Sequence, residues 1–72
     1  MRGIILSYNR QRGWGFIGHE AGDVFFHVSG LKNRKYVEVN DLVEFELSKR
    51  NGRDIAINVV VIVPANANGG AR

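Results

Sequence analysis

Short stretches rich in Val, Ile and Phe recur along the chain, separated by turns that contain Gly and Asn. Apolar residues do not repeat at intervals of three and four for the length of a helix, so the pattern predicts a chain that is nearly all strand. The five strands expected from this pattern cover residues 3–8, 14–19, 24–28, 42–48 and 54–63. The region 29–40 has no clear alternation and is expected to be a long loop, with one helical turn near Leu31.

Two turns indicate how these strands connect. Residues 20–23 suit a tight turn between the second and third strands, and Asn51-Gly52 is the strongest hairpin signal in the chain. A meander of three strands, a long connection and a final hairpin make up the strands of a small five-stranded antiparallel barrel. We therefore expect an all-β barrel over residues 1–64, followed by a flexible tail, 65–72, that has no large apolar residue.

Length and composition limit what such a barrel does. The 72 residues include no cysteine, which excludes a disulfide framework and a thiolate zinc site, and they support one small core. No stretch approaches the ~20 apolar residues of a membrane-spanning helix, and the first residues do not resemble a signal peptide, so a cytoplasmic protein without a membrane partner is expected. Two histidines, His19 and His27, make a poor metal site without a carboxylate cluster, and neither metal nor cofactor is expected.

Basic side chains outnumber acidic ones by ten to seven, which gives a formal net charge of +3. An excess of basic residues is typical of proteins that bind nucleic acid, although net charge alone does not identify a site. The basic residues gather in three groups at predicted turns: Arg10 and Arg12; Lys32, Arg34 and Lys35; Lys49, Arg50 and Arg53. The third group is equally compatible with phosphate contact and with a solvated hairpin turn.

Aromatic side chains are the candidate binding groups. Side chains alternate between the two faces of a strand. On this basis one face of the second and third strands carries three rings and an imidazole: Trp14, Phe16, Phe25 and His27. The opposite face of the third strand carries an apolar set: Val24, Phe26 and Val28. Burying the apolar set with Ile17 makes the better core, so the rings are predicted to lie together on the outer face.

An exposed aromatic patch usually marks a binding site. A nucleobase that stacks on an aromatic side chain gains about 1–3 kcal/mol, and flanking cations hold the phosphates. Gly13 and Gly15, which stand between the rings, are expected to leave the sheet surface open so that a base lies flat on it. For an arbitrary sequence, the alternative that such rings form the core of a small barrel is the commoner case.

Two segments resemble the motifs of one family. Residues 12–17, Arg-Gly-Trp-Gly-Phe-Ile, resemble the first ribonucleoprotein motif of the cold-shock domain, a Lys-Gly-Phe-Gly-Phe-Ile pattern. Residues 24–28, Val-Phe-Phe-His-Val, resemble the second motif, a Val-Phe-Val-His-Phe pattern, and the resemblance extends over most of residues 3–60. It implies a five-stranded oligonucleotide-binding barrel (OB-fold), and the two motifs together favour a stacking role for the rings over a core role.

The resemblance implies single-stranded RNA or DNA as the partner, bound with low sequence selectivity, and a role as an RNA chaperone or in cold-shock or transcription regulation. It implies nucleic-acid contacts for seven residues: Tyr8, Arg12, Trp14, Phe16, Phe25, His27 and Tyr36. Ser7 and Val28 stand where the family has aromatic residues, and Leu6 where it has a lysine. We therefore expect this chain to bind nucleic acid more weakly, or in a different register, than a typical member of the family. Stacking does not distinguish RNA from DNA.

Two other classes of function compete with nucleic-acid binding. An enzyme is not expected, because no serine has a general base at a recognisable spacing in the sequence. A barrel this small also hardly encloses a pocket. A protein-interaction or assembly module is the alternative, and it rests on an unbroken apolar run: Val59, Val60, Val61, Ile62 and Val63. Such a run suits a strand covered by a second copy in a homodimer. The favoured interpretation is that it extends the last strand and closes the barrel.

Overall fold

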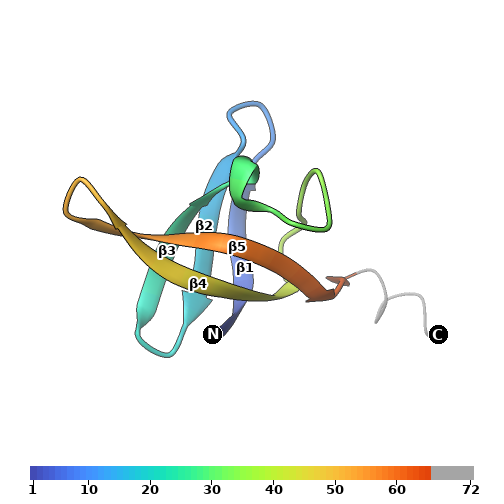
Figure 1. Cartoon of the computed structure of the whole chain (residues 1–72). Helices are drawn as coiled ribbons and strands as arrows, with labels where there is room; N and C mark the ends of the chain where they lie inside the picture. Colours follow the sequence, from blue (N-terminus) through green and yellow to red (C-terminus); the bar gives the residue numbers. More distant parts are fainter. Residues whose placement is uncertain (66–72) are drawn as a thin grey trace.

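The computed structural model describes residues 1–65 and consists almost entirely of strands (Figure 1). The strands are β1 (Arg2–Asn9), β2 (Trp14–His19), β3 (Gly22–His27), β4 (Leu42–Arg50) and β5 (Arg53–Val63). One turn of 3-10 helix, η1 (Val28–Gly30), follows β3. The predicted strands are confirmed, with ends that differ by at most two residues. Apart from Ala65, the predicted tail lies outside the described residues.

The strands close into a barrel in the order β1-β2-β3-β5-β4, with β4 paired back to β1. The predicted all-β barrel is therefore confirmed. Every strand pairing is antiparallel except that of β3 with β5, where Phe25 and Phe26 run parallel to Ile55 and Ala56. The parallel contact is possible because residues 28–52 separate the two strands, and parallel pairing needs a long connection.

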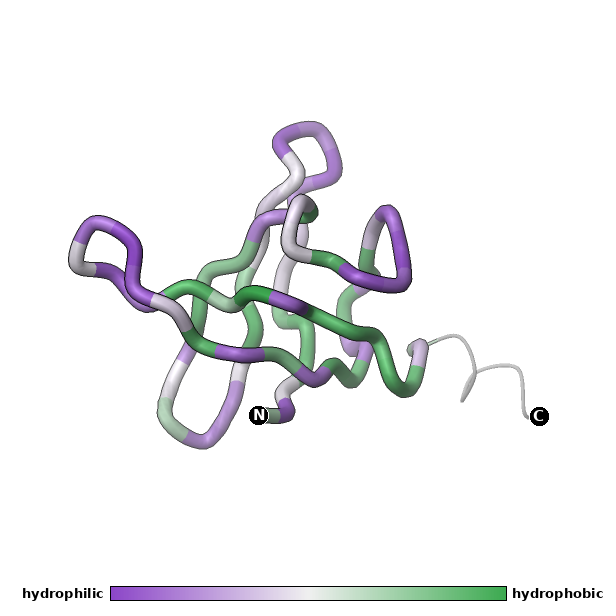
Figure 2. Tube along the Cα trace, viewed as in Figure 1, coloured by the Kyte–Doolittle hydropathy of each residue, from purple (hydrophilic) through white to green (hydrophobic). Residues whose placement is uncertain are grey.

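The core is formed by apolar side chains from all five strands and the long loop. Its buried members are Ile5, Ile17, Val24, Phe26, Val37, Val43, Phe45, Ala56, Val59 and Val61. Within the strands they occupy alternate positions, as the pleat requires, except between Ala56 and Val59, where the register of β5 with β4 shifts. The tips of the loops are mostly hydrophilic (Figure 2). Val28 was expected in this core but is only half-buried. The chain leaves β3 after His27 and enters η1, so the alternation of faces ends before Val28.

The apolar run 59–63 serves the barrel itself. Val59 and Val61 are 0% and 6% exposed and belong to the core, while the residues between and after them are half-buried or exposed. The Asn33 side chain fastens this strand, because its Nδ2 donates to the Val61 carbonyl at 3.0 Å and its Oδ1 accepts from the Val61 N–H at 3.1 Å. The run therefore extends β5 against β4, and the predicted homodimer through it has no support.

Asp41 is the only buried charged residue between residues 1 and 65, with 1% of its surface exposed. Its Oδ2 accepts from the Glu38 N–H at 2.9 Å, and its Oδ1 accepts from the Ala65 N–H at 2.7 Å. The carboxylate therefore joins the end of the long loop to the segment that follows β5. Ala65, predicted to begin the flexible tail, is held by this contact.

Candidate nucleic-acid interface

The pairing of β2 with β3 brings four of the predicted site residues together. Trp14 lies opposite His27, and Phe16 lies opposite Phe25. The ring centroids are 6.1 Å apart for Trp14 and Phe16, and 6.0 Å apart both for Trp14 and Phe25 and for Phe16 and Phe25. None of the four belongs to the core, which confirms their predicted place on the outer face. These four residues are called the aromatic platform below.

The imidazole of His27 is oriented by the first residues of η1. Its Nδ1 accepts from the Ser29 N–H at 3.1 Å and lies 3.0 Å from the Ser29 hydroxyl. A neutral imidazole that accepts at Nδ1 carries its proton on Nε2. His27 is exposed, so this N–H is available to an acceptor on a bound ligand. His19 lies at the other end of β2, edge-on to the ring of Phe45 at 5.3 Å.

The two glycines of the first motif do not leave the outer surface open, as the sequence interpretation expected. Gly15 is buried and faces inward, where a Cβ atom would overlap the Ser7 carbonyl oxygen and come within 2.9 Å of the Phe26 ring. Gly13 has a φ of +77°, a conformation that favours glycine, and it ends the β1–β2 turn directly before β2. Both glycines are therefore required by the backbone and the packing beneath the platform.

Tyr8 is not part of the aromatic platform. Its ring stacks on Phe26 with centroids 6.1 Å apart and an angle of 14° between the planes, and it packs against the core. The cause is a β-bulge between Ile5 and Ser7, which puts one extra residue into β1. Beyond the bulge the two faces are exchanged. Ser7 pairs with outward-facing Phe16, and Tyr8 pairs with inward-facing Gly15.

The loop between β1 and β2 carries the predicted cation Arg12 beside the platform. The Arg12 N–H donates to Asn9 Oδ1 at 3.0 Å, and the Arg12 side chain is exposed. The Gly13 carbonyl accepts from the Val28 N–H at 2.7 Å, which fixes the loop to the start of η1. Arg12 therefore projects from an anchored backbone.

Tyr36, the predicted loop aromatic, lies beside this same loop. It is 42% exposed, and the guanidinium carbon of Arg10 lies 5.2 Å from the centre of its ring, within the range of a cation–π contact. Arg10 was not among the predicted site residues. The contact joins the long loop to the β1–β2 loop. Among the described residues, no ring contact joins Tyr36 to the platform.

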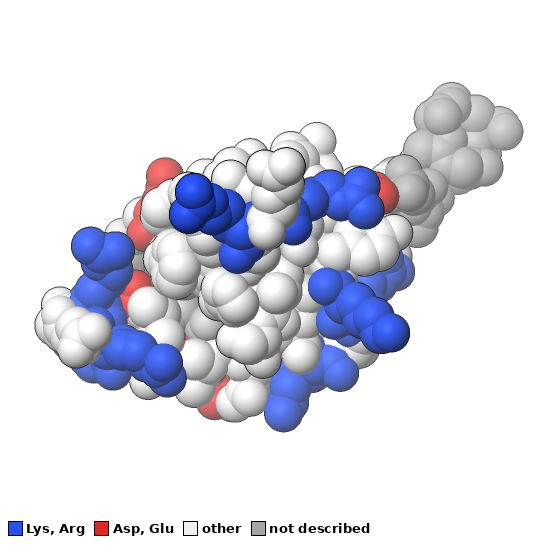
Figure 3. All heavy atoms as spheres, turned by 90° about the horizontal axis from the view of Figure 1, so that it is seen from above, with Lys and Arg blue, Asp and Glu red and all other residues white. Residues whose placement is uncertain are grey.

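Cations surround one end of the barrel. The three basic groups lie on the β1–β2 loop, on the long loop and on the β4–β5 hairpin, and the first two stand side by side in Figure 1. Viewed from above, an area without charged side chains has blue Lys and Arg side chains on several of its sides (Figure 3). Acidic side chains are sparse on this face.

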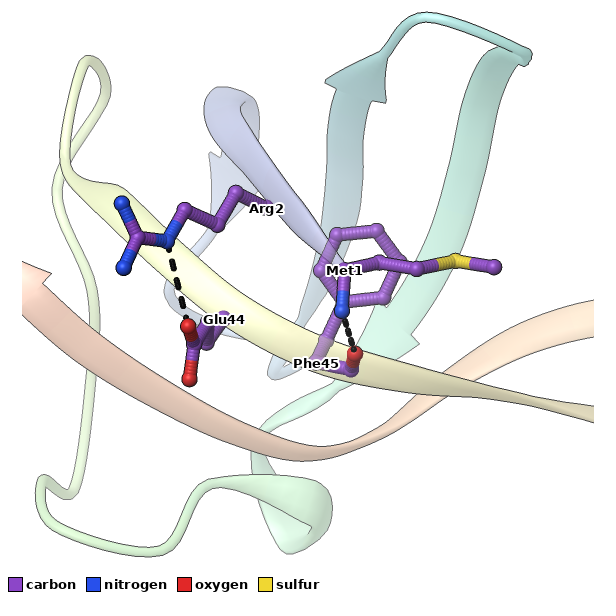
Figure 4. Close-up of polar contacts among 4 residues, drawn as sticks. All are labelled: Met1, Arg2, Glu44 and Phe45. Atoms are coloured by element: carbon purple, nitrogen blue, oxygen red, sulfur yellow. Dashed lines mark hydrogen bonds and ion pairs between the residues drawn. The ribbon is translucent and has the colours of Figure 1, made fainter.

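Few of these cations are neutralised. Within residues 1–65 there are two ion pairs, Arg2 with Glu44 at 3.1 Å (Figure 4) and Lys49 with Asp54 at 3.3 Å. The Met1 amino group donates to the Phe45 carbonyl at 3.0 Å, as Figure 4 also shows. This bond and the Arg2–Glu44 pair both join the start of β1 to β4. The basic side chains of the β1–β2 loop and of the long loop form no ion pair within this described part of the chain.

An open groove adjoins the platform, and sequence reasoning did not find it. Its volume is about 810 Å³, and it lies between the β3–η1 segment and the β4–β5 hairpin. Phe25 and His27 form one wall together with Ser29 and Gly30. The opposite side is lined by residues of the hairpin and of β5: Arg50, Asn51, Arg53, Ile55, Ala56, Ile57 and Asn58. The β3–β5 pairing that creates this groove is non-local, and no short motif signals it.

Comparison with known proteins identifies the family. The family model described as the 'Cold-shock' DNA-binding domain matches residues 1–62. The chain belongs to the cold-shock domain family. The family expected from the two motifs is thus confirmed, and its description is one of nucleic-acid binding and not of catalysis. Within residues 1–65, no helix of this cold-shock domain is long and apolar enough to cross a membrane.

Named relatives agree with this assignment. Cold shock protein CspB of Bacillus caldolyticus is 37% identical over 62 residues, which covers 82% of this chain and 94% of that protein. Cold shock-like protein CspG of Escherichia coli K12 is 30% identical over 66 residues, which covers 86% and 94%. A solved structure titled drosophila Unr CSD456 matches with a TM-score of 0.68 and 26% identity over 89% of this chain. The cold-shock domain spans 27% of that solved chain.

Proposed function

We propose that this cold-shock domain binds single-stranded RNA or DNA by stacking bases on the aromatic platform. The observation that carries the proposal is the platform itself, in which the rings of Trp14, Phe16 and Phe25 lie 6.0–6.1 Å from one another outside the core. Each stacked base is worth about 1–3 kcal/mol. Arg12 and the neighbouring basic loops supply contacts to phosphate, which carry no sequence information.

Low sequence selectivity follows from this chemistry. Every base has a π-face, so stacking accepts each of them. The platform offers two polar groups to a base edge or a phosphate, the Nε2 of His27 and the indole N–H of Trp14. The platform therefore discriminates weakly between bases and between RNA and DNA.

The proposed role is to keep single strands open. A protein that binds unstacked bases competes with base pairing and shifts a hairpin toward its open form by mass action, without ATP. This is the activity of an RNA chaperone, and a role in transcription or in the response to cold would use the same binding step. We place this activity in the cytoplasm, as the sequence predicts.

The test uses Trp14, the only tryptophan in the chain. Short oligo-dT and oligo-U are titrated against Trp14 fluorescence at low and at physiological salt, with a blunt duplex of the same length as a ligand control. We expect saturable quenching by the single strands that weakens with salt. Phe25→Ala removes one ring and keeps the reporter, so it should weaken binding about 5- to 150-fold, the equivalent of 1–3 kcal/mol.

Val63→Ala is the matched control. Val63 is 37% exposed at the far end of β5 and does not line the platform or the groove. Its truncation should leave affinity unchanged. Absence of quenching in a sample shown to be folded by circular dichroism would refute the stacking proposal, and so would equal affinities of Phe25→Ala and the unmodified protein.

A further inference from the structure

A second surface of the barrel is apolar and lies outside the aromatic platform and the groove. Four aliphatic side chains, called the aliphatic strip below, form it: Ile4, Leu6, Leu42 and Val63. We propose that the aliphatic strip binds a short amphipathic helix of another protein, with aliphatic side chains along one face and lysine or arginine beside them. The proposal goes beyond nucleic-acid binding and does not depend on it, because no residue of the strip belongs to the platform or lines the groove.

Strand pairing places three of these side chains in one row. Ile4 lies opposite Leu42, and Leu42 lies opposite Val63, so the row crosses β1, β4 and β5. Directly paired residues lie on the same face of a sheet. Ile4 comes directly before buried Ile5 in β1, which identifies this face as the outer one.

Leu6 joins the row from the side of β2. Gly18 pairs with Ile4 and follows buried Ile17, so a Cβ atom at Gly18 would point outward, where it would meet three side-chain carbons of Leu6 at 2.9–3.1 Å. Leu6 therefore covers Gly18 beside Ile4. The two side chains remain 46% and 36% exposed, and contiguous exposed apolar surface usually marks an interaction site.

The spacing of the strip matches one face of a helix. Neighbouring strands lie about 4.8 Å apart, so the side chains of β1, β4 and β5 follow one another at about that interval. In a helix that crosses the strands, residues three or four positions apart are separated by about 4.5–6 Å along the axis. Three such residues therefore meet Ile4, Leu42 and Val63 in turn, which is the pattern of an amphipathic helix on an apolar surface.

Acidic side chains border the strip and favour a basic partner. Four of the seven acidic residues of the chain fall within residues 38–46, and residues 36–48 contain no lysine or arginine. Glu44 and Glu46 follow Leu42 at alternate positions of β4, so the pleat brings them to the same outer face. Glu44 pairs with Arg2 at 3.1 Å, as Figure 4 shows.

Glu46 differs from Glu44 in its partner. Its Oε1 accepts from the neutral side-chain amide of Asn58 at 3.1 Å, and it forms no ion pair among the residues that the structure describes. The outer face of β4 therefore carries a negative charge that a lysine or arginine on a docked helix would complement.

The same charges disfavour other occupants. Carboxylates repel the phosphates of nucleic acid and the anionic headgroups of a membrane. A twofold dimer sets the same patch of two copies face to face, and would bring Glu46 of both copies into one interface. Four partly exposed side chains also fall short of the about 800 Å² per partner that a standard protein interface buries. A short basic helix needs less area and is attracted by the acidic border.

Five variants separate the strip from the rest of the surface. Leu6→Ser and Val63→Ser each remove an exposed aliphatic side chain, and Glu46→Gln removes the charge while keeping an oxygen for its hydrogen bond. Tyr36→Ser is the matched control, because Tyr36 is exposed to a similar extent but lies beside the β1–β2 loop. Phe25→Ala is the second control and removes a ring of the platform.

The probe is a synthetic peptide of leucine and lysine in which leucines recur at intervals of three and four residues. Its counterpart has glutamate in place of every lysine. Titration of the isotope-labelled domain, followed by two-dimensional NMR, gives the affinity and identifies the amides that shift. We expect the leucine–lysine peptide to shift the amides of the strip and not those of the platform. Leu6→Ser and Val63→Ser should each weaken this binding about fivefold and Glu46→Gln about twofold, and both controls should keep the affinity of the unmodified domain.

Three results would overturn the proposal. They are the absence of amide shifts with the leucine–lysine peptide, equal affinity for the leucine–glutamate peptide, and unchanged affinity in both Leu6→Ser and Val63→Ser. Shifts of the strip that grow with domain concentration in the absence of peptide would assign it to a second copy and would also overturn the proposal. All of these results leave base stacking intact, because stacking is measured separately with oligo-dT and Trp14. Thermal unfolding of each variant confirms that the measurements are made on folded protein.

Discussion

Replacing Gly15 with alanine tests whether this glycine serves the packing or the binding surface. A Cβ atom at Gly15 would overlap the Ser7 carbonyl oxygen of β1 and lie 2.9 Å from Cε1 of Phe26. The first is backbone and the second belongs to a side chain that is 0% exposed, so neither moves aside at low cost. Overpacking a filled interior costs about 1–3 kcal/mol, and a disturbed ladder hydrogen bond adds about 1 kcal/mol. We expect Gly15→Ala to lose about 2–4 kcal/mol of stability.

Thermal unfolding followed by circular dichroism measures this loss. In a domain of this size, 1 kcal/mol shifts Tm by about 4–8 °C, so Gly15→Ala should lower Tm by about 10–30 °C. Two alanine substitutions provide controls. At Gly18 the new Cβ would meet the side chain of Leu6 at 2.9–3.1 Å, and that side chain is 46% exposed and free to move. At Gly30 nothing lies closer than 3.7 Å. Both controls should lose less than about 1 kcal/mol.

The opposite result has a definite meaning. If Gly15→Ala kept the Tm of the unmodified domain and weakened oligonucleotide binding, the glycine would open the outer surface, as the motif alone suggests. The argument from the inward direction of its Cβ would then be wrong.

Three more substitutions separate binding from stability. Arg12→Gln should weaken binding of every sequence alike and flatten the salt dependence by about 0.7 in log–log slope, which titrations at several salt concentrations measure; an unchanged slope would contradict a phosphate contact. Asp41→Ala leaves the N–H groups of Glu38 and Ala65 without their acceptor, so urea unfolding should show a loss of about 2–4 kcal/mol, and a loss below about 0.5 kcal/mol would contradict the linking role. Tyr8→Ala should lower stability by about 2–3 kcal/mol, because the Tyr8 ring packs on Phe26 and the core. The affinity of the folded protein for oligonucleotides should change little. A large loss of affinity at unchanged stability would return Tyr8 to the binding face.

The strands and the platform were predictable because their signals are local. Alternation of apolar and polar residues is a property of each strand by itself, and Asn51-Gly52 marks a hairpin turn in which both residues have positive φ, +54° and +77°. Trp14 to His19 is predicted without error for this reason. The alternation of side chains along β2 and β3 then determines which rings lie on the outer face, since only one choice of inner face gives an apolar core.

The errors come from non-local features. The bulge in β1 reverses the face of Tyr8, yet its cause is the register with β2 and no residue of β1 signals it. Val28 leaves the core because the chain turns into η1 after His27, at a point where the Val28 N–H bonds to the Gly13 carbonyl, fifteen positions earlier in the chain. The buried carboxylate of Asp41 looks in the sequence like one more residue of an acidic stretch. Each of these features depends on which strands meet, and strand alternation does not contain that information.

The position of the binding face follows from one row of residues across the barrel. Ser7, Phe16, Phe25, Ile55 and Ser48 pair side by side from β1 to β4. On the β1 side the row passes at once from a ring to Ser7, which offers no π-surface to a base. On the β5 side it continues into the groove with Ile55 and the two arginines of the hairpin. A strand that stacks on Phe25 therefore gains more apolar surface by extending toward β5 than toward β1, while each side offers two arginines, Arg50 and Arg53 or Arg10 and Arg12. The absence of a ring at Ser7 thus shifts the proposed binding path toward the β4–β5 hairpin and leaves its centre on the platform.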